Sequence, residues 1–295
     1  MTEIFGVPTV AFMGQLMLGL VNGSFYAILS LGLAVIFGML NIVNFAHGAL
    51  YMVGAFVAWM LLNYLGVNYW FALIIAPLVV GAIGALIEMT MLRRLQQLDH
   101  LYGLLLTFGL ALIFEGAFRE FYGSSGQPYE LPEIFRGVFD LGFMFLPKYR
   151  AWVVFVSIFL CLFTWYVIEK TKLGAYLRAG TENPNMVRAF GINVPLMVTL
   201  TYAFGVGLAG LAGVMAAPIY QVSPLMGSNI IIVVFAVVVI GGMGSILGSI
   251  LTGLALGLIE GLTKVFYAEL SSTVVFIIMV IVLMIRPAGL FGREK

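Results

Sequence analysis

Uncharged polar side chains form the densest group of chemically capable residues in this chain. The segment from Ile4 to Ile87 contains no Asp, Glu, Lys or Arg, yet amides, hydroxyls and one imidazole gather at two places within it. The residues concerned are Asn22, Ser24, Tyr26, Asn41, Asn44 and His47. These side chains donate and accept hydrogen bonds, and their i, i+3 and i, i+4 spacings can place pairs on one helical face. They could therefore hold a polar solute.

Catalytic and metal-binding patterns are weak by comparison. The histidines His47 and His100 and the single Cys161 lie in separate segments without metal-ligand spacing, so neither a metal nor another cofactor is expected. The phosphate-binding pattern Gly-x-x-x-x-Gly-Lys-Ser/Thr does not occur, so any ATP must be bound by another chain. The string at 123–126 has the Gly-x-Ser-Gly form of intramembrane serine proteases, but Ser125 lies in a stretch typical of an exposed turn. We expect no enzyme.

Composition explains what kind of molecule must position these residues. Of 295 residues, 62% are apolar and only 9% are charged, against about 25% charged in ordinary globular chains. A second charge-free stretch runs from Ala189 to Ile259. Stretches of this length suit a bundle of membrane spans of about 20 residues each. Disorder, nucleic-acid binding and a disulfide scaffold are excluded, and a lipid bilayer is the expected surroundings.

Eight apolar runs can be marked between polar or charged breaks. They lie near residues 12–38, 46–64, 70–92, 101–119, 151–168, 195–218, 229–264 and 271–285. Three of the apolar runs are followed by clusters of basic residues, which mark the cytoplasmic side. The clusters are Arg93 and Arg94; Lys170, Lys172, Arg178 and Arg188; and Arg286, Arg293 and Lys295. The segment 119–150 mixes both signs of charge, so we expect it outside.

The run at 229–264 must divide if the basic clusters ending at Arg188 and beginning at Arg286 are both cytoplasmic. The chain must then cross the membrane an even number of times between them, but only three apolar runs lie there. The 36 residues of the run at 229–264 would extend about 54 Å as one helix, against a hydrocarbon core of about 30 Å. The glycine-rich string Gly241–Ser245 lies where such a helix should break. We therefore predict an all-α polytopic membrane protein with about 8–9 transmembrane helices, its N-terminus outside and its C-terminus cytoplasmic. Whether 229–240 spans or re-enters stays open.

Both halves of the chain thus contain an interrupted apolar segment, near 41–48 and near 241–245. Polar groups at bilayer depth are costly unless they face protein or a watery cavity, and Gly-broken spans in corresponding halves point to a transport pathway. A tight cytoplasmic turn explains either interruption equally well. On the first interpretation, the pathway candidates are the six polar residues named above.

The remaining charges favour ion pairs over a proton relay. Glu88 lies close to Arg93 in the sequence, while Glu115 with Arg119 and Glu260 with Lys264 have i, i+4 spacing. A relay would need carboxylates near the bilayer midplane, and none is expected there. This argues against a proton-coupled secondary transporter.

The predicted cytoplasmic segment from Glu169 to Pro195 contains its own helix signals. Asn183 can cap a helix, Pro184 suits its first turn, and Gly191 can end it in the left-handed conformation. An apolar side of this helix would have no obvious cover within the chain, which favours a partner protein. Packing on the chain's own helix ends is the alternative. The apolar side comprises Met186, Val187 and Phe190.

Several strings resemble, in order, the first permease subunit (LivH type) of bacterial branched-chain amino-acid ABC importers. They are Gly23-Ser24-Phe25-Tyr26-Ala27, Leu31-Gly32, Phe37-Gly38-Met39, Asn41-Ile42-Val43-Asn44-Phe45-Ala46-His47-Gly48, Leu177-Arg178-Ala179, Gly191-Ile192-Asn193-Val194, Gly241-Gly242-Met243-Gly244-Ser245 and Arg286-Pro287-Ala288-Gly289-Leu290-Phe291-Gly292. The resemblance covers nearly the whole chain. Many members carry an acidic residue directly after the His-Gly pair, where this chain has Ala49.

The resemblance implies a single permease domain, 1–295, with a cytoplasmic coupling loop at 169–194. It further implies an inner-membrane assembly with a second homologous permease subunit, two cytoplasmic ATPase subunits and a periplasmic substrate-binding protein. In such importers a short cytoplasmic helix of the permease docks into the ATPase. That role maps onto Thr181, Glu182, Pro184, Met186, Val187, Arg188, Phe190, Gly191 and Ile192.

The expected function is therefore a permease subunit for branched-chain amino acids, driven by ATP hydrolysis on partner chains. Urea and short-amide permeases share similar strings, so the resemblance leaves the substrate open. A stand-alone secondary transporter or channel is a further alternative, distinguished by transport without ATP. An intramembrane protease acting through Ser125 is the last alternative.

Overall fold

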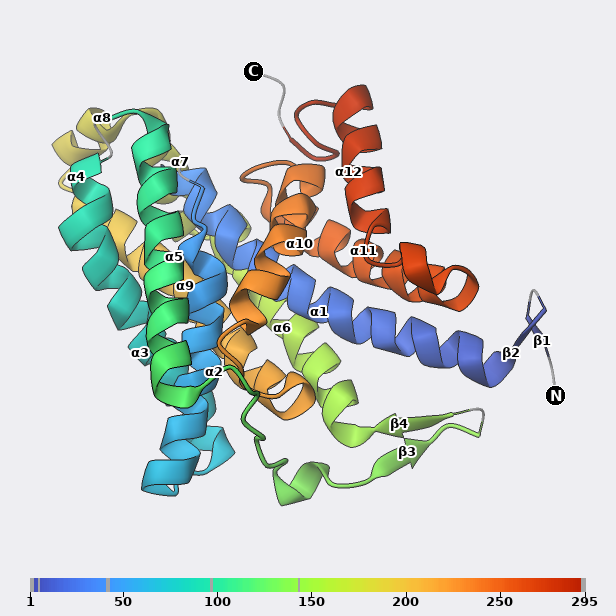
Figure 1. Ribbon diagram of the computed structural model, residues 1–295. Coiled ribbons are helices and arrows are strands. Elements are labelled where there is room, and N and C mark those ends of the chain that lie inside the picture. The colour runs from blue at the N-terminus through green and yellow to red at the C-terminus, as the bar shows by residue number, and fades with distance from the viewer. Residues whose placement is uncertain (1–2, 5, 41–42, 96–97, 143, 293–295) are drawn as a thin grey trace. The chain divides into compact units, whose positions relative to one another are not determined.

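The structure is almost entirely helical. The computed structural model describes residues 3–4, 6–40, 43–95, 98–142 and 144–292 (Figure 1). Its α-helices are α1 (Thr9–Leu40), α2 (Ala46–Leu65), α3 (Tyr69–Ile87), α4 (Arg93–Leu95), α5 (His100–Tyr122), α6 (Lys148–Lys170), α7 (Lys172–Glu182), α8 (Pro184–Ala189), α9 (Val194–Tyr220), α10 (Met226–Gly241), α11 (Ile246–Phe266) and α12 (Val274–Ile285). A π-helix, η1 (Glu88–Leu92), joins α3 to α4, and two 3₁₀ turns are η2 (Glu133–Phe135) and η3 (Ala268–Leu270).

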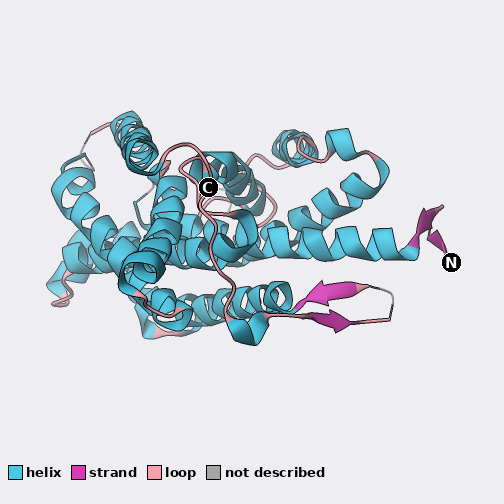
Figure 2. Cartoon of the chain, turned by 60° about the horizontal axis from the view of Figure 1, so that its bottom comes forward, coloured by secondary structure: helices cyan, strands magenta, loops and turns pink. Residues whose placement is uncertain are grey.

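Within the residues that the structure describes, strands occur in two short antiparallel hairpins (Figure 2). One pairs β1 (Glu3–Ile4) with β2 (Val7–Pro8), and the other pairs β3 (Val138–Asp140) with β4 (Phe145–Pro147). The second hairpin lies in the segment 119–150, for which the mixed charges predict a position outside. A backbone at membrane depth must satisfy its polar groups internally, which accounts for helix elsewhere.

Seven helices in the described part of the chain are long and apolar enough to cross a membrane, and two shorter apolar helices accompany them. The seven begin at Thr9, Ala46, Tyr69, His100, Lys148, Val194 and Ile246; the shorter ones are α10 and α12. The prediction of an all-α polytopic membrane protein is confirmed. The helix in the last predicted run, 271–285, is shorter than expected. The chain turns through η3, and α12 begins only at Val274.

The predicted division of the long C-terminal run is also confirmed. Helix α10 ends at Gly241 and α11 begins at Ile246. In the intervening turn Gly242 and Gly244 have φ of +96° and +85°, a conformation that glycine adopts without strain. Ser245 then caps α11, accepting a hydrogen bond from the Gly248 amide.

The chain forms two compact units. The first comprises 1–30, 130–162 and 233–295, and the second comprises 31–129 and 163–232. Three of the four boundaries fall inside α1, α6 and α10. Within the second unit α9 packs along α2 and α3. Within the first, α1 lies against α11, and a buried cluster joins α10, α11 and α12. That cluster is Ala236, Val237, Ile240, Leu256 and Val275.

Small residues bring the helices of both units into direct backbone contact. A Cβ added to Gly54 of α2 would collide with Gly210 of α9, and one added to Gly213 would collide with the Tyr51 carbonyl. In the other unit, a Cβ on Gly19 of α1 would lie 2.5 Å from the Gly257 carbonyl oxygen. Lipid supplies no hydrophobic drive for helix association, so such close packing must replace it.

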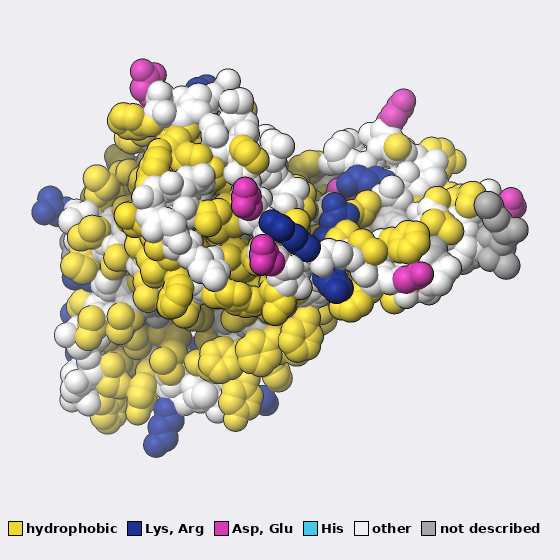
Figure 3. All heavy atoms as spheres, turned by 90° about the horizontal axis from the view of Figure 1, so that it is seen from below, with side chains coloured by type: hydrophobic (Ala, Val, Ile, Leu, Met, Phe, Trp, Pro, Cys, Tyr) yellow, Lys and Arg dark blue, Asp and Glu magenta, His cyan; other side chains and the backbone are white. Residues whose placement is uncertain are grey.

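The exposed surface is predominantly hydrophobic. Figure 3 shows hydrophobic side chains over most of the face in view, with acidic and basic groups in small patches. Large apolar residues such as Phe71, Leu105 and Phe155 are well exposed on α3, α5 and α6. This inverts the pattern of a soluble protein and suits surroundings of lipid and partner subunits.

Replacing Gly19 by Val should therefore destabilise the first unit by about 1–3 kcal/mol, because overpacking would separate α1 from α11. The control is Gly14→Val on the same helix, where an added Cβ meets nothing within 4 Å. Thermal unfolding of the detergent-solubilised protein measures the difference. Equal melting temperatures for the two variants would show that the α1–α11 contact is not close.

Candidate functional site

The junction between α1 and α2 holds two of the predicted pathway residues. Asn44 and His47 are completely buried, while Asn41 lies outside the described residues. The Phe45 amide donates a hydrogen bond to Thr107 Oγ1 of α5 at 3.2 Å. Thr107 can in turn donate to the Val43 carbonyl at 3.2 Å. The irregular backbone between the helices is thus anchored on α5.

Both polar side chains of this junction face neighbouring helices. Asn44 lies beside the Tyr202 phenol of α9, yet within the described residues neither of its amide atoms nor the Tyr202 hydroxyl meets hydrogen-bonding geometry. The His47 ring lies against Gly32 of α1, where an added Cβ would be 3.0 Å from Cε1. The amide of Asn44 and the phenol of Tyr202 thus form a buried polar pair of a kind that can hydrogen-bond a polar solute.

The other predicted pathway residues belong to the first unit. Ser24 donates to the Leu20 carbonyl at 2.8 Å within its own helix. The Tyr26 hydroxyl donates to Glu260 Oε2 of α11 at 2.7 Å, and Glu260 Oε1 accepts from Lys264 at 2.5 Å. Asn22 is partly buried. The five candidates among the described residues are therefore divided between the two units.

An ion pair with a buried carboxylate lies where α3 passes into α4. Glu88 is completely buried, and its Oε2 accepts from Arg93 Nη2 at 2.9 Å and from Thr199 Oγ1 of α9 at 2.6 Å. Arg93 Nη2 also donates to the Pro195 carbonyl at 3.3 Å. These bonds tie the first turn of α9 to the π-helix η1. The sequence indicated Glu88 and Arg93, but not Thr199, which lies 111 residues from Glu88.

The predicted coupling segment forms two short helices, α7 and α8. Asn183 caps α8 by accepting from the Met186 amide at 3.0 Å, Pro184 occupies the first turn, and Gly191 has φ of +81°. These local predictions are confirmed. The segment ends at α9, whose first turn is capped by Asn193.

One part of the predicted uncovered face is wrong. Val187 is buried, because α8 packs against α7 and α9. The exposed apolar surface consists instead of Met186 and Phe190, whose exposed fractions are 57% and 75%. Around it Thr181, Glu182, Pro184, Arg188 and Gly191 are exposed, and Ile192 is partly buried.

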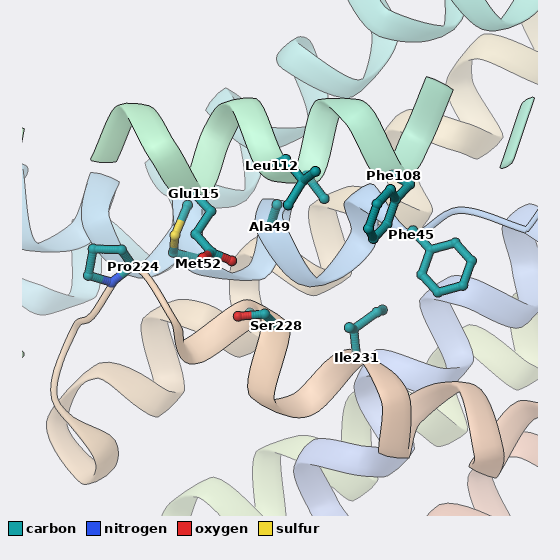
Figure 4. Close-up of a pocket in the computed structure, with 11 residues that line it drawn as sticks. Phe45, Ala49, Met52, Phe108, Leu112, Glu115, Pro224, Ser228 and Ile231 are labelled. Atoms are coloured by element: carbon teal, nitrogen blue, oxygen red, sulfur yellow. The ribbon is translucent and has the colours of Figure 1, made fainter. Parts of the chain in front are cut away.

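A pocket in the second unit lies among α2, α5 and the beginning of α10 (Figure 4). It has a volume of about 70 Å³, several times the 10–15 Å³ or so that one water occupies by this measure. Its lining is Phe45, Ala49, Met52, Phe108, Ala111, Leu112, Glu115, Pro224, Gly227, Ser228 and Ile231. Phe45 and Ala49 alternate with the buried Asn44 and His47, so the α1–α2 junction presents an apolar side to the pocket. The sequence did not single out this pocket.

No cluster of three His, Cys, Asp or Glu side chains that could hold a metal ion occurs in the described parts of the chain. The polar groups of the two units are instead amides, hydroxyls and paired carboxylates. Such groups bind and orient a solute by hydrogen bonds and ion pairs.

Comparison with known proteins identifies relatives along nearly the whole chain. Residues 15–283 match the family described as "Branched-chain amino acid transport system / permease component". The high-affinity branched-chain amino acid transport system permease protein BraD of Pseudomonas aeruginosa is 31% identical, covering 96% of this chain and 97% of the relative. LivH of Escherichia coli K12, with the same description, is 29% identical over 96% of both chains.

A second type of permease is also similar. LivM of Escherichia coli K12, another high-affinity branched-chain amino acid transport system permease protein, is 28% identical over 92% of this chain and 68% of its own length. No solved structure matches the chain.

The Glu88–Arg93 pair should contribute measurably to stability. In a double-mutant cycle with Glu88→Gln and Arg93→Gln, we expect a coupling free energy above about 1 kcal/mol, because Glu88 is buried and hydrogen-bonded. The exposed pair Glu133–Arg136, whose charges lie 3.8 Å apart, is the control and should give about 0–0.5 kcal/mol. Thermal unfolding of the purified variants measures both, and equal couplings would contradict the structural role.

Proposed function

The chain belongs to the branched-chain amino acid transport system permease family, and on that premise we propose that it is a membrane-spanning subunit of a binding-protein-dependent ABC importer for branched-chain amino acids. The observation that carries this proposal is similarity over 96% of the chain to permeases named for that transport. The seven span-length helices agree with such a role. None of the relatives named above is described as a urea or amide permease.

We infer that this subunit works beside a second, homologous permease. The similarity to both LivH and LivM supports a common origin for two kinds of permease chain, and the exposed apolar faces of α3, α5 and α6 offer surface for a neighbour. A periplasmic binding protein would deliver the substrate. We propose that the assembly lies in a cytoplasmic membrane, with the N-terminus outside and the C-terminus inside.

Energy would come from two ATPase subunits on the cytoplasmic side. The sequence has no phosphate-binding loop of its own. The exposed Met186 and Phe190 of α8 form a compact apolar contact on a capped, preformed helix. We propose that α8 and its flanking residues 181–192 dock into an ATPase subunit.

The same geometry suggests how the docking helix acts on the membrane helices. The chain passes from α8 through Gly191 into α9, and Arg93 holds the start of α9 to η1 through Pro195 and Thr199. A displacement of α8 would therefore be transmitted to α9 and α3 together. Because α9 packs along α2, it would reach the α1–α2 junction.

We propose that Asn44 and His47 at this junction, together with Asn22, Ser24, Tyr26 and Asn41, contribute to the transport pathway. The support is strongest for Asn44, whose completely buried amide lies beside the Tyr202 phenol. It is weaker for Ser24, whose hydroxyl is satisfied within α1.

Affinity purification from mildly solubilised membranes tests the assembly. We expect the wild-type chain to recover a second polytopic chain and two ATPase subunits, identified by mass spectrometry. Recovery of the chain alone, under cross-linking that prevents loss of partners, would favour a self-sufficient transporter.

Phe190→Ser should lower the recovery of the ATPase subunits at least about ten-fold, because a buried aromatic contact at an interface commonly contributes 2 kcal/mol or more. Ile134→Ser is the matched control, since Ile134 is 70% exposed but lies in the segment expected outside. Its ATPase recovery should equal that of the wild type. Unchanged recovery with Phe190→Ser would refute the docking assignment.

A further inference from the structure

The pocket of the second unit combines an apolar wall with one charged end. Met52, Leu112 and Ile231 approach it from α2, α5 and α10, as Figure 4 shows. Glu115 of α5 points into the same space, towards the helix that carries Ser228. The carboxylate is the charged group among the residues that line the pocket.

Glu115 is an acidic residue inside a membrane-spanning helix. It lies seven residues before the end of α5 at Tyr122, about 10 Å along the helix axis, and four fifths of its side-chain surface is buried. Arg119 Nη2 donates to Glu115 Oε1 at 2.6 Å. An intramembrane charged residue is costly and usually serves a function, and here Glu115 lines a cavity.

The base of the pocket is held by two glycines. A Cβ on Gly48 of α2 would lie 2.6 Å from the Gly227 carbonyl oxygen of α10, so the two backbones touch directly. Ala49 and Ala111 keep the space above this contact open because their side chains are small. The cavity is therefore shaped by helix contacts and does not depend on one flexible side chain.

We propose that this pocket is a substrate-contact site for an aliphatic zwitterionic amino acid on its way through the membrane. The branched side chain lies among Met52, Leu112 and Ile231, and the α-ammonium binds the carboxylate of Glu115. The α-carboxylate lies beside Arg119, which is already hydrogen-bonded to Glu115. This assignment rests on the proposed function and identifies within it the part of the chain that recognises the substrate.

The composition of the pocket favours this ligand class over the alternatives. Urea has neither an apolar side chain to fill the wall nor a charge for Glu115. An anion would meet the carboxylate unfavourably, and a cation with a long polar side chain would leave polar groups unpaired against apolar residues. A small zwitterion with a branched hydrocarbon side chain fits both parts of the pocket, because its side chain packs on the apolar wall and its ammonium group binds Glu115.

Side-chain selectivity tests the apolar wall. The wild-type importer and its variants are reconstituted into vesicles with their ATPases and binding protein, and ATP-driven uptake of leucine and of valine is measured. Ala111→Leu fills the pocket, so leucine uptake should fall about ten-fold or more relative to valine uptake, as expected for one or two excess methylene groups. Ala117→Leu, on an exposed face of the same helix and outside the lining, should leave the ratio unchanged.

Charge removal tests the polar end. Glu115→Gln should lower uptake of both amino acids about ten-fold or more, since hydrogen bonds to a charged group contribute about 1.5–3 kcal/mol, while recovery of the ATPase subunits stays at the wild-type level. Glu115→Asp, which retains the charge, should restore part of the uptake. The proposal is overturned if Ala111→Leu leaves the leucine-to-valine ratio unchanged or if Glu115→Gln transports like the wild type. Failure of the wild-type importer to accumulate either amino acid would instead refute the proposed function.

Discussion

Direct backbone contact between helices at glycine is the interaction on which the rest of this molecule depends. Gly54 and Gly210 join α2 to α9, Gly19 and Gly257 join α1 to α11, and Gly48 and Gly227 join α2 to α10. In a bilayer the helices gain nothing by hiding apolar side chains from lipid, so these contacts supply the association energy. They also fix where side chains from different helices meet, and both the buried Asn44 and the apolar pocket are consequences of that placement.

Charged side chains in the membrane helices are stabilised in a different way, by ion pairs with nearby residues of the same segment. Within the described residues Glu88, Glu115 and Glu260 each lie in or beside a membrane helix and each binds a basic residue. Two of these pairs follow the i, i+4 rule and could be read from the sequence. An ion pair lowers the free-energy cost of placing a carboxylate in a membrane span. The second carboxylate oxygen can then accept a hydrogen bond from another group, as Glu260 Oε2 accepts from the Tyr26 hydroxyl.

The sequence predicted the features that local patterns determine. Apolar length and charge position gave the spans, the glycines at 241–244 marked the break, and Asn183, Pro184 and Gly191 defined α8. What escaped prediction was pairing across long separations, such as Tyr26 with Glu260 and Glu88 with Thr199, which lie 234 and 111 residues apart. The buried position of Val187 was also missed, because it depends on how the neighbouring helices α7 and α9 pack around α8. Helical periodicity places a residue on a face, but only tertiary packing decides what that face meets.

The π-helix η1 determines the direction in which the side chains of the following helix, α4, point. In an ordinary α-helix, residues five apart are separated by about 140° around the axis, so Glu88 and Arg93 would point in different directions. The wider turn, closed by the Arg93 amide on the Glu88 carbonyl, brings both onto one side and allows the ion pair with Thr199. Because a π turn holds one residue more than the α turn it replaces, the five-residue spacing of Glu88 and Arg93 becomes equivalent to an i, i+4 spacing, which corresponds to about 40° around an ordinary α-helix. The extra residue is thus absorbed within η1, and the pair meets on one side of the helix as Glu115 with Arg119 and Glu260 with Lys264 do.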